Sequence, residues 1–318
     1  MQTTEDLTRS TRTRERRGGS CTYVLITPAR NEAKFIELTI QSVLAQTIRP
    51  VKWVIVSDGS TDGTDDVVRD YAAQHNWIEL VRRPARRERT FSAKVDAFNV
   101  GHHRLDILDY SVIGNLDADI SFDDKEYFEF LISRFAENPR LGIAGTSFRE
   151  GNITYPSRLH CIEDVLGACQ MFRRECFGAI GGYQPISGGG IDMVAVLAAQ
   201  AAGWQTRTFT EKLCIHHRAV GSAHCTNLLK RWLHTGRKDY LLGSHPTFEV
   251  FRCTYQTARR PYVIGGLLML LGYFWAMLCG VERPIPQQLV NLRRNGQMKR
   301  LQGILRRALW PRLPTPTR

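Results

Sequence analysis

Two kinds of periodicity alternate along the first half of the chain, and this alternation constrains the fold more than any other feature. Short apolar, β-branched runs are separated by segments whose apolar residues recur at helical spacing. This order predicts a mostly parallel sheet with helices on both faces, because parallel neighbours need a crossover connection. The predicted strands are residues 23–27, 52–56, 78–81 and 110–114, and the predicted helices lie within residues 28–46, 65–73 and 92–100.

Polar clusters follow three of these strands. They are Pro28–Glu32, Ser57–Asp62 and Asp117–Asp119. In a parallel sheet the carboxyl ends of the strands meet at one edge, where ligands bind. We therefore expect the three clusters to form one site.

The third cluster ends a buried strand with two like charges, Asp117 and Asp119, one residue apart. Repulsion makes this arrangement costly unless a cation or hydrogen-bond donors lie nearby. The two carboxylates therefore either hold a metal ion or cap the following loop. The turn "SDGSTDGT" at residues 57–64 also has two interpretations, because Asp, Ser and Gly favour both a plain helix-capping turn and a ligand contact.

The net charge is +12, which is compatible with nucleic acid, anionic lipid or a phosphorylated substrate. Residues 1–20 are polar and basic and are predicted to be a disordered arm without the apolar core of a secretory signal. The eight cysteines form no CxxC pair, which argues against a structural zinc site or a disulfide framework. The basic run at residues 82–89 is expected to be solvated or to attract phosphate, without a catalytic role.

With these motifs in place, the sequence resembles the family 2 glycosyltransferases of the membrane-associated bacterial type. The resemblance runs from Thr22 to His217 and rests on four motifs in the family's order. It implies the GT-A fold of the nucleotide-diphospho-sugar transferases and an inverting, metal-dependent transfer of a hexose-like sugar. The motifs are "TPARNEAKFIELTIQSVLAQ", "VIVSDGSTDGT", "NLDAD" and "GGGIDM..VLAAQAAGW".

The resemblance also assigns roles to single residues. Asp119 would coordinate Mn²⁺ or Mg²⁺, and Asp117 would contact ribose or metal-bound water, since hard cations prefer oxygen ligands and bridge phosphates. Asp58 would bind the nucleotide, and Lys94 would contact the donor unless it belongs to a solvated helix face. The residues expected to line the base and ribose are Pro28, Ala29, Asn31 and Glu32.

An inverting transfer needs a base for the acceptor hydroxyl. The family often places Glu-Asp at the start of a helix, and Ile191-Asp192 occupies that position here, so the first acid is missing. We assign the base to Asp192, with an ordinary helix N-cap as the alternative. His217 is predicted to be a further metal ligand, with His216 as the alternative and a structural role open for either.

Residues 261–280 contain no charge, and residues 281–318 carry nine Arg or Lys against a single Glu282. The uncharged segment is a core helix, a spanning helix or an interfacial one, and an in-plane arrangement broken near Gly265 and Gly266 fits the charges best. The basic tail is expected to lie on an anionic lipid surface. Both features place the protein at the cytoplasmic face of the cell membrane.

Three regions are therefore expected. They are the arm of residues 1–20, a glycosyltransferase domain of residues 21–225 (a nucleotide-binding half, 21–120, and an acceptor half, 121–225) and a helical region of residues 226–318. The donor would be a nucleotide sugar, UDP-linked in preference to GDP-linked, and the acceptor a lipid-linked or polysaccharide intermediate of cell-surface glycan synthesis. One alternative is a polyprenyl-phosphate glycosyltransferase. Another is a basic scaffold that binds membrane or nucleic acid, although the tail lacks the aromatic series for stacking on bases, so no nucleic acid is expected.

Overall fold

The structure is a computed structural model. It describes residues 21–85, 91–151, 153–155, 161–186, 188–218, 228–257 and 262–309. The predicted arm of residues 1–20, residues 86–89 of the basic run and the last nine residues of the tail lie outside these ranges.

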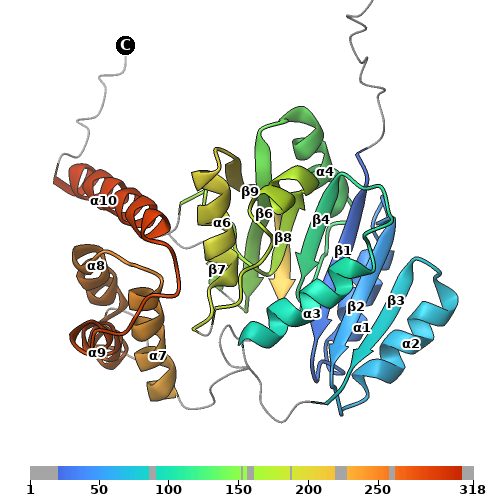
Figure 1. The fold of residues 1–318 in the computed structure, drawn as a ribbon, viewed down its shortest axis with the longest axis horizontal. Helices are drawn as coiled ribbons and strands as arrows, with labels where there is room; N and C mark the ends of the chain where they lie inside the picture. Colours follow the sequence, from blue (N-terminus) through green and yellow to red (C-terminus); the bar gives the residue numbers. More distant parts are fainter. Residues whose placement is uncertain are drawn as a thin grey trace, which may run out of the picture.

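The first half of the chain forms the predicted alternation of strands and helices (Figure 1). β1 pairs in parallel with both β2 and β4, and β2 pairs in parallel with β3. The strands are β1 (Tyr23–Ala29), β2 (Lys52–Asp58), β3 (Ile78–Arg83) and β4 (Val112–Leu116), and the helices are α1 (Ile36–Leu44), α2 (Thr64–Gln74) and α3 (Phe91–His103).

The sheet as a whole is mixed, so the prediction of a mostly parallel sheet is wrong for its second half. Antiparallel β8 lies between β4 and β6, and the order of the main path is β3-β2-β1-β4-β8-β6-β9-β5. Both faces of β8 are buried, so its sequence does not alternate between apolar and polar residues. It therefore resembles the start of a helix. The added elements are β5 (Ile120–Ser121), α4 (Tyr127–Glu137), β6 (Leu141–Glu150), β7 (Ile153–Tyr155), β8 (Cys169–Arg173), α5 (Arg174–Ala179), α6 (Ile191–Ala201) and β9 (Gln205–His216).

Helices cover both faces of the sheet, as predicted. One core contains the apolar faces of α1 and α4, and the other contains those of α3, α5 and α6. Because both faces of the central strands are buried, β1, β2 and β4 are almost continuously apolar. The polar residues that follow these strands are therefore held at a rigid edge.

Four helices form the carboxyl-terminal region, on one side of the sheet in Figure 1. They are α7 (Leu228–Leu241), α8 (Pro246–Thr257), α9 (Ile264–Leu278) and α10 (Gln287–Leu309). The break predicted near Gly265 and Gly266 does not occur within α9. This helix begins at Ile264, and both glycines are buried in its first turn. Among the described residues, no helix has the length and apolar character needed to cross a membrane.

The tail predicted to lie on lipid includes α10, which packs partly on the rest of the protein. Within α10, Leu289 and Val290 pack with residues of α6 in a small separate core. Arg293 donates to the carbonyl of Leu242, 2.7 Å away, and Arg300 forms an ion pair with Asp164 at 2.9 Å. These two arginines are therefore bonded within the protein, whereas Lys299 and Arg306 of α10 are exposed, and contact of the tail with lipid stays a prediction. The division at residues 225 and 226 remains a proposal.

Candidate active site

The three predicted clusters lie together, because β1 is flanked by β2 on one side and β4 on the other. Ala29, at the end of β1, lies opposite Ser57 in β2, and Pro28 lies opposite Val56. The polar residues after these strands therefore begin at the same level of the sheet.

The segment after β1 is braced by the turn after β2. The backbone N–H of Thr61 donates to Oδ1 of Asn31 at 2.8 Å, and the N–H of Glu32 donates to Oγ1 of Thr64 at 2.8 Å. Oδ2 of Asp62 accepts from the N–H of Ala33 at 3.0 Å. The turn "SDGSTDGT" thus shapes a loop at the site in addition to leading into α2.

Asp58 is buried at the end of β2, and its Oδ1 lies 2.8 Å from an Nη atom of Arg83 at the end of β3. The neighbouring Arg82 forms an ion pair with Asp65 at 2.6 Å. The first two arginines of the basic run are therefore paired with carboxylates. Arg83 was missed by the sequence analysis, because a run of arginines gives no local sign of which one turns inward.

A cluster of potential metal ligands lies after β4. One ligand atom each of Asp117, Asp119 and His216 lies within 4.8 Å of the other two. Nε2 of His216 is 3.5 Å from Oδ1 of Asp119. The short antiparallel pair of β5 and β9 brings them together, because Ile120 lies directly opposite His216.

His217, the residue selected from the sequence, points elsewhere. Its Nε2 is 2.8 Å from Oγ of Ser121, and its ring stacks on Phe35 with the ring centroids 5.9 Å apart. Successive side chains of a strand point to opposite faces, so only one of the two histidines can face Asp119. The geometry favours His216 over His217 as the ligand.

Two basic side chains balance the carboxylates of the cluster. Nζ of Lys94 lies 2.5 Å from Oδ1 of Asp117. Arg218 pairs with Glu32, and its Nε is 3.6 Å from Oδ2 of Asp119. Lys94 therefore lies in the site as predicted, whereas Arg218 was not identified from the sequence.

The pKa values of Asp117 and Asp119 are shifted in opposite directions. Burial raises the pKa of Asp117, with a further contribution from Asp119 and opposition from Lys94. Burial also acts to raise the pKa of Asp119, but His216 and Arg218 outweigh it and hold this pKa below its usual value. Burial acts to lower the pKa of Lys94, and the carboxylates, Asp117 first, reverse that effect and raise it. The pKa of Asp117 thus lies above the ordinary value of a carboxyl group and that of Asp119 below it.

Asp192 is the second residue of α6, and Gly190 occupies the N-cap position. The Asp192 carboxylate makes no capping bond to its own helix; its Oδ2 accepts from the N–H of Gly167 at 3.2 Å. The alternative of an ordinary N-cap is therefore wrong. Asp192 also lies close enough to act electrostatically on the pKa of Lys94, at the cluster.

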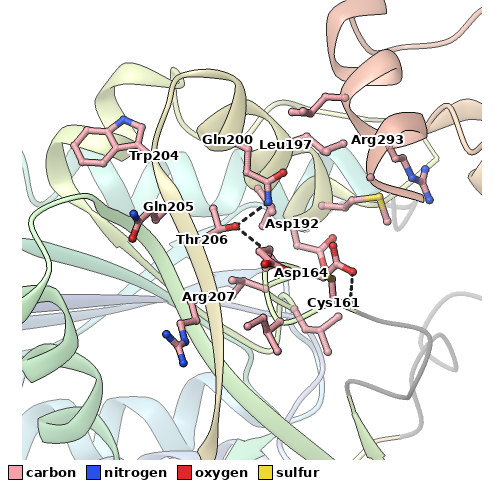
Figure 2. A pocket seen from close by; sticks show the side chains of 18 of the residues that line it. Cys161, Asp164, Asp192, Leu197, Gln200, Trp204, Gln205, Thr206, Arg207 and Arg293 are labelled. Carbon is pink, nitrogen blue, oxygen red and sulfur yellow. Dashed lines mark hydrogen bonds between the residues drawn. The ribbon is translucent and has the colours of Figure 1, made fainter. Parts of the chain in front are cut away.

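A cavity of about 1030 Å³ opens beside Asp192, and Figure 2 shows its lining. α6 contributes Leu197 and Gln200, the residue before β9 contributes Trp204, and α10 contributes Arg293. The cavity thus lies between the sheet domain and the carboxyl-terminal helices. Of the candidate site residues, only Asp192 lines this cavity.

The residues after β4 fit a divalent metal ion. Two carboxylates and one imidazole supply the oxygen and nitrogen donors that suit Mn²⁺ and, with more oxygen ligands, Mg²⁺. Nδ1 of His216 is buried without a hydrogen-bond partner in the described part of the chain, and Nε2 faces Asp119. That orientation leaves Nε2 available as a ligand atom.

The family of the chain follows from its sequence match. Residues 24–181 match the family model described as "Glycosyl transferase family 2". The chain is a family 2 glycosyltransferase. The matched residues include β2, β4 and nearly all of β1, together with Asp117 and Asp119, whereas Asp192 and His216 lie beyond them.

Curated relatives of this glycosyltransferase include two poly-beta-1,6-N-acetyl-D-glucosamine synthases of Staphylococcus epidermidis. They are 26% and 25% identical to it over 210 residues, with 60% of this chain and 47% of each relative covered. The chain therefore spans about half the length of the curated relatives it matches.

Solved structures show the same mixed α/β fold of GT-A type. The mannosyltransferase PcManGT from Pyrobaculum calidifontis, in complex with GDP-Man and Mn²⁺, has a TM-score of 0.55 and 16% identity, with 91% of this chain and 88% of that chain covered. Residues 1–349 of Staphylococcus aureus TarS in complex with UDP-GlcNAc have a TM-score of 0.53 and 12% identity, with 82% and 74% covered. At these identities the likeness concerns the fold alone.

Proposed function

We propose that this glycosyltransferase moves a hexose-like sugar from a nucleotide-diphosphate sugar to a growing polysaccharide or a lipid-linked intermediate of cell-surface glycan synthesis. The observation that carries the proposal is the meeting of Asp117, Asp119 and His216 next to Lys94, with Asp192 close enough to act electrostatically on Lys94. A UDP-sugar is the preferred donor and a GDP-sugar the alternative, since proteins of this fold include complexes with UDP-GlcNAc and with GDP-Man.

The nucleotide would lie across the ends of β1 and β2. Pro28, Ala29, Asn31 and Glu32 would line the base and ribose, and Asp58 would accept a hydrogen bond from the base. The bracing bonds from Thr61 and Thr64 keep this loop in one shape, which lowers the entropy lost on binding.

Asp119 and His216 would hold Mn²⁺ or Mg²⁺, with Asp117 against ribose or a metal-bound water. When bound, such an ion offsets the charge that develops on the leaving nucleoside diphosphate. Lys94 lies beside Asp117 and Arg218 beside Asp119, and both would support that charge as hydrogen-bond donors.

Asp192 would act as the base. Its carboxylate would accept the proton of the acceptor hydroxyl while that oxygen attacks the anomeric carbon and the nucleoside diphosphate leaves from the opposite side. One direct displacement inverts the configuration at this carbon. The bond from the N–H of Gly167 orients the carboxylate without taking up both of its oxygens.

We place the reaction at the cytoplasmic face of the cell membrane, where nucleotide sugars are available. The similarity to polysaccharide synthases supports this placement. A polyprenyl phosphate as the direct acceptor is the alternative within the family, and transfer to that lipid phosphate without any sugar acceptor would distinguish it. A scaffold function alone is disfavoured, because it leaves the carboxylate cluster without a role.

The test is a transfer assay with purified protein, a panel of UDP- and GDP-sugars, Mn²⁺ or Mg²⁺, and lipid-linked or oligosaccharide acceptors. We expect one donor to be used, and Asp192→Asn to lower kcat by about a thousandfold or more while nucleotide binding is kept. If Asp192→Asn transferred sugar at the normal rate, Asp192 would not be the base. Absence of nucleotide binding in folded protein would overturn the donor site.

A further inference from the structure

Helix α9 exposes a row of large apolar residues, whereas an ordinary water-exposed helix turns such residues toward the core. Its small residues Gly265, Gly266, Gly272 and Ala276 are buried. Its large apolar residues point outward at spacings of three and four, which places them on one side of the helix. These residues and their exposed fractions are Ile264 52%, Leu267 56%, Leu271 54%, Trp275 66% and Leu278 79%.

The buried side of α9 packs against the neighbouring helix α7, so α9 cannot rotate to bury its outward side instead. A Cβ on Gly272 would lie 2.1 Å from the carbonyl oxygen of Leu233, and one on Gly236 would lie 1.9 Å from that of Met269. The backbones of α7 and α9 therefore touch, and only glycine permits this approach. The outward side of α9 is fixed by this contact.

The neighbouring helix continues the apolar surface. Leu229 and Leu233 of α7 are 52% and 39% exposed. We call these two leucines and the five outward residues of α9 the α7–α9 face. Apolar patches of this kind mark interaction sites when they are contiguous.

Charge indicates what covers the α7–α9 face. Residues 226–318 carry 16 of the 43 Lys and Arg residues of the chain but three of its 31 Asp and Glu residues, so the rest of the chain is close to neutral. On α7, Lys230 and Arg237 are exposed next to the leucines, and the backbone N–H of Arg237 adjoins Gly272. An apolar face bordered by cations is complementary to a bilayer with anionic headgroups.

We propose that the α7–α9 face lies in the plane of an anionic membrane, with the outward side chains of α9 in the headgroup–acyl boundary and the cations of α7 at the phosphates. A helix of 15 residues is about 22 Å long, shorter than the hydrocarbon core of about 30 Å. Trp275 suits the boundary because its ring is apolar and its N–H is polar. This inference concerns how the protein is held, so it stands or falls separately from the sugar-transfer function.

The lipid contact would then lie on the α7–α9 face and not on the basic tail. Arg293 of α10 is bonded to Leu242 and Asp239, and Arg300 to Asp164. The helix with the free apolar face is α9. The basic tail would therefore add to the positive electrostatic potential of the carboxyl-terminal region, but it would not insert into the membrane.

The test is flotation of the full chain with phosphatidylcholine vesicles, with and without phosphatidylglycerol. We expect binding to the anionic vesicles and at least about tenfold weaker partitioning for Leu271→Gln and for Trp275→Gln, because each removes one large inserted side chain. Both side chains are more than half exposed, so folding is expected to be kept, and nucleotide binding checks it. Ile107→Gln is the matched control, since Ile107 is 94% exposed on the sheet domain.

Each other result would overturn the proposal. Binding that is unchanged in Leu271→Gln and Trp275→Gln would place the lipid contact elsewhere. Equal binding to neutral vesicles would remove the role of charge. Lipid-free sedimentation that shows a dimer, lost in both variants and without vesicle binding, would assign the face to a second copy of the chain.

Discussion

Nε2 of His216 lies 3.5 Å from Oδ1 of Asp119, although 96 residues separate the two along the chain. The pair exists because β5, only two residues long, is hydrogen-bonded to the end of β9. A backbone bond from the N–H of His217 to the carbonyl of Asp119, 2.9 Å long, continues that pairing. A strand pair of this size is held by the sheet behind it, so the site depends on the register of β9 against β6.

His216→Asn is expected to weaken Mn²⁺-dependent nucleotide binding by about 10- to 100-fold, because it removes an imidazole ligand beside Asp119. Calorimetric titration of nucleotide with and without Mn²⁺ measures this loss. His217→Asn is the matched control and is expected to change binding by less than about threefold, since His217 faces Ser121 and Phe35. The reverse ranking of the two variants would restore His217 as the ligand.

Lys94→Met is expected to have opposite effects on the metal and on the nucleotide. Nζ of Lys94 is a cation paired with Asp117 beside Asp119, so without nucleotide the variant should bind Mn²⁺ more tightly, by about tenfold, because a like charge next to the ion is removed. It should bind nucleoside diphosphate more weakly, because a donor to the phosphates is lost. Electron paramagnetic resonance of free Mn²⁺ measures the first quantity.

The control for this variant is Lys52→Met. Lys52 forms an ion pair with Glu79 at 3.0 Å on strands β2 and β3, away from the carboxylate cluster, and both affinities should stay unchanged. If Lys94→Met weakened Mn²⁺ binding in the absence of nucleotide, Lys94 would not compete with the ion.

Gly272→Ala and Gly303→Ala form a pair that tests the contact between α7 and α9. Both glycines lie inside helices, but a Cβ at 272 meets the Leu233 carbonyl at 2.1 Å, whereas one at 303 meets nothing within 4 Å. We expect Gly272→Ala to lower the free energy of unfolding by about 2 kcal/mol or more and Gly303→Ala to raise it by about 0.5–1 kcal/mol. Chemical denaturation measures both, and equal effects would contradict the close contact.

The ion pair of Asp124 and Lys212 gives a pH-dependent contribution to stability. Nζ of Lys212 lies 2.5 Å from Oδ2 of Asp124, and this hydrogen bond holds the pKa of Asp124 below its usual value. A carboxyl whose pKa is lower in the folded state stabilises the fold above its unfolded pKa, about 3.9, and loses that effect as the pH falls through the folded pKa.

Lys212→Met should therefore lower the free energy of unfolding at neutral pH, by less than about 1 kcal/mol because the pair is partly exposed. The difference from the wild type should vanish in acid below the folded pKa of Asp124. Unfolding curves at both pH values measure it, and a difference that persists in acid would mean that packing of the lysine stem is responsible.

The residues that the sequence located well are those with a local signal. Asp58 ends buried β2 and Asp117 and Asp119 come after buried β4, and the rule that parallel strands place their carboxyl ends together was sufficient to predict that they lie at one edge of the sheet. Lys94 was placed by resemblance, and its bond to Asp117 puts it in that site. The errors are in β8, whose burial on both faces hides the alternation of a strand, and in the break predicted within α9.

By itself, the sequence determined the alternating half of the sheet, the carboxylates at its edge and the family, because these depend on periodicity and on motifs within a few residues of each other. Only the tertiary structure decided that His216 faces Asp119, that Arg218 joins Glu32, and that α9 buries its glycines and exposes its leucines. Strand register and helix packing join residues far apart in the chain, and a shift of one residue reverses which side chain faces the site. Local pattern contains no information about that shift.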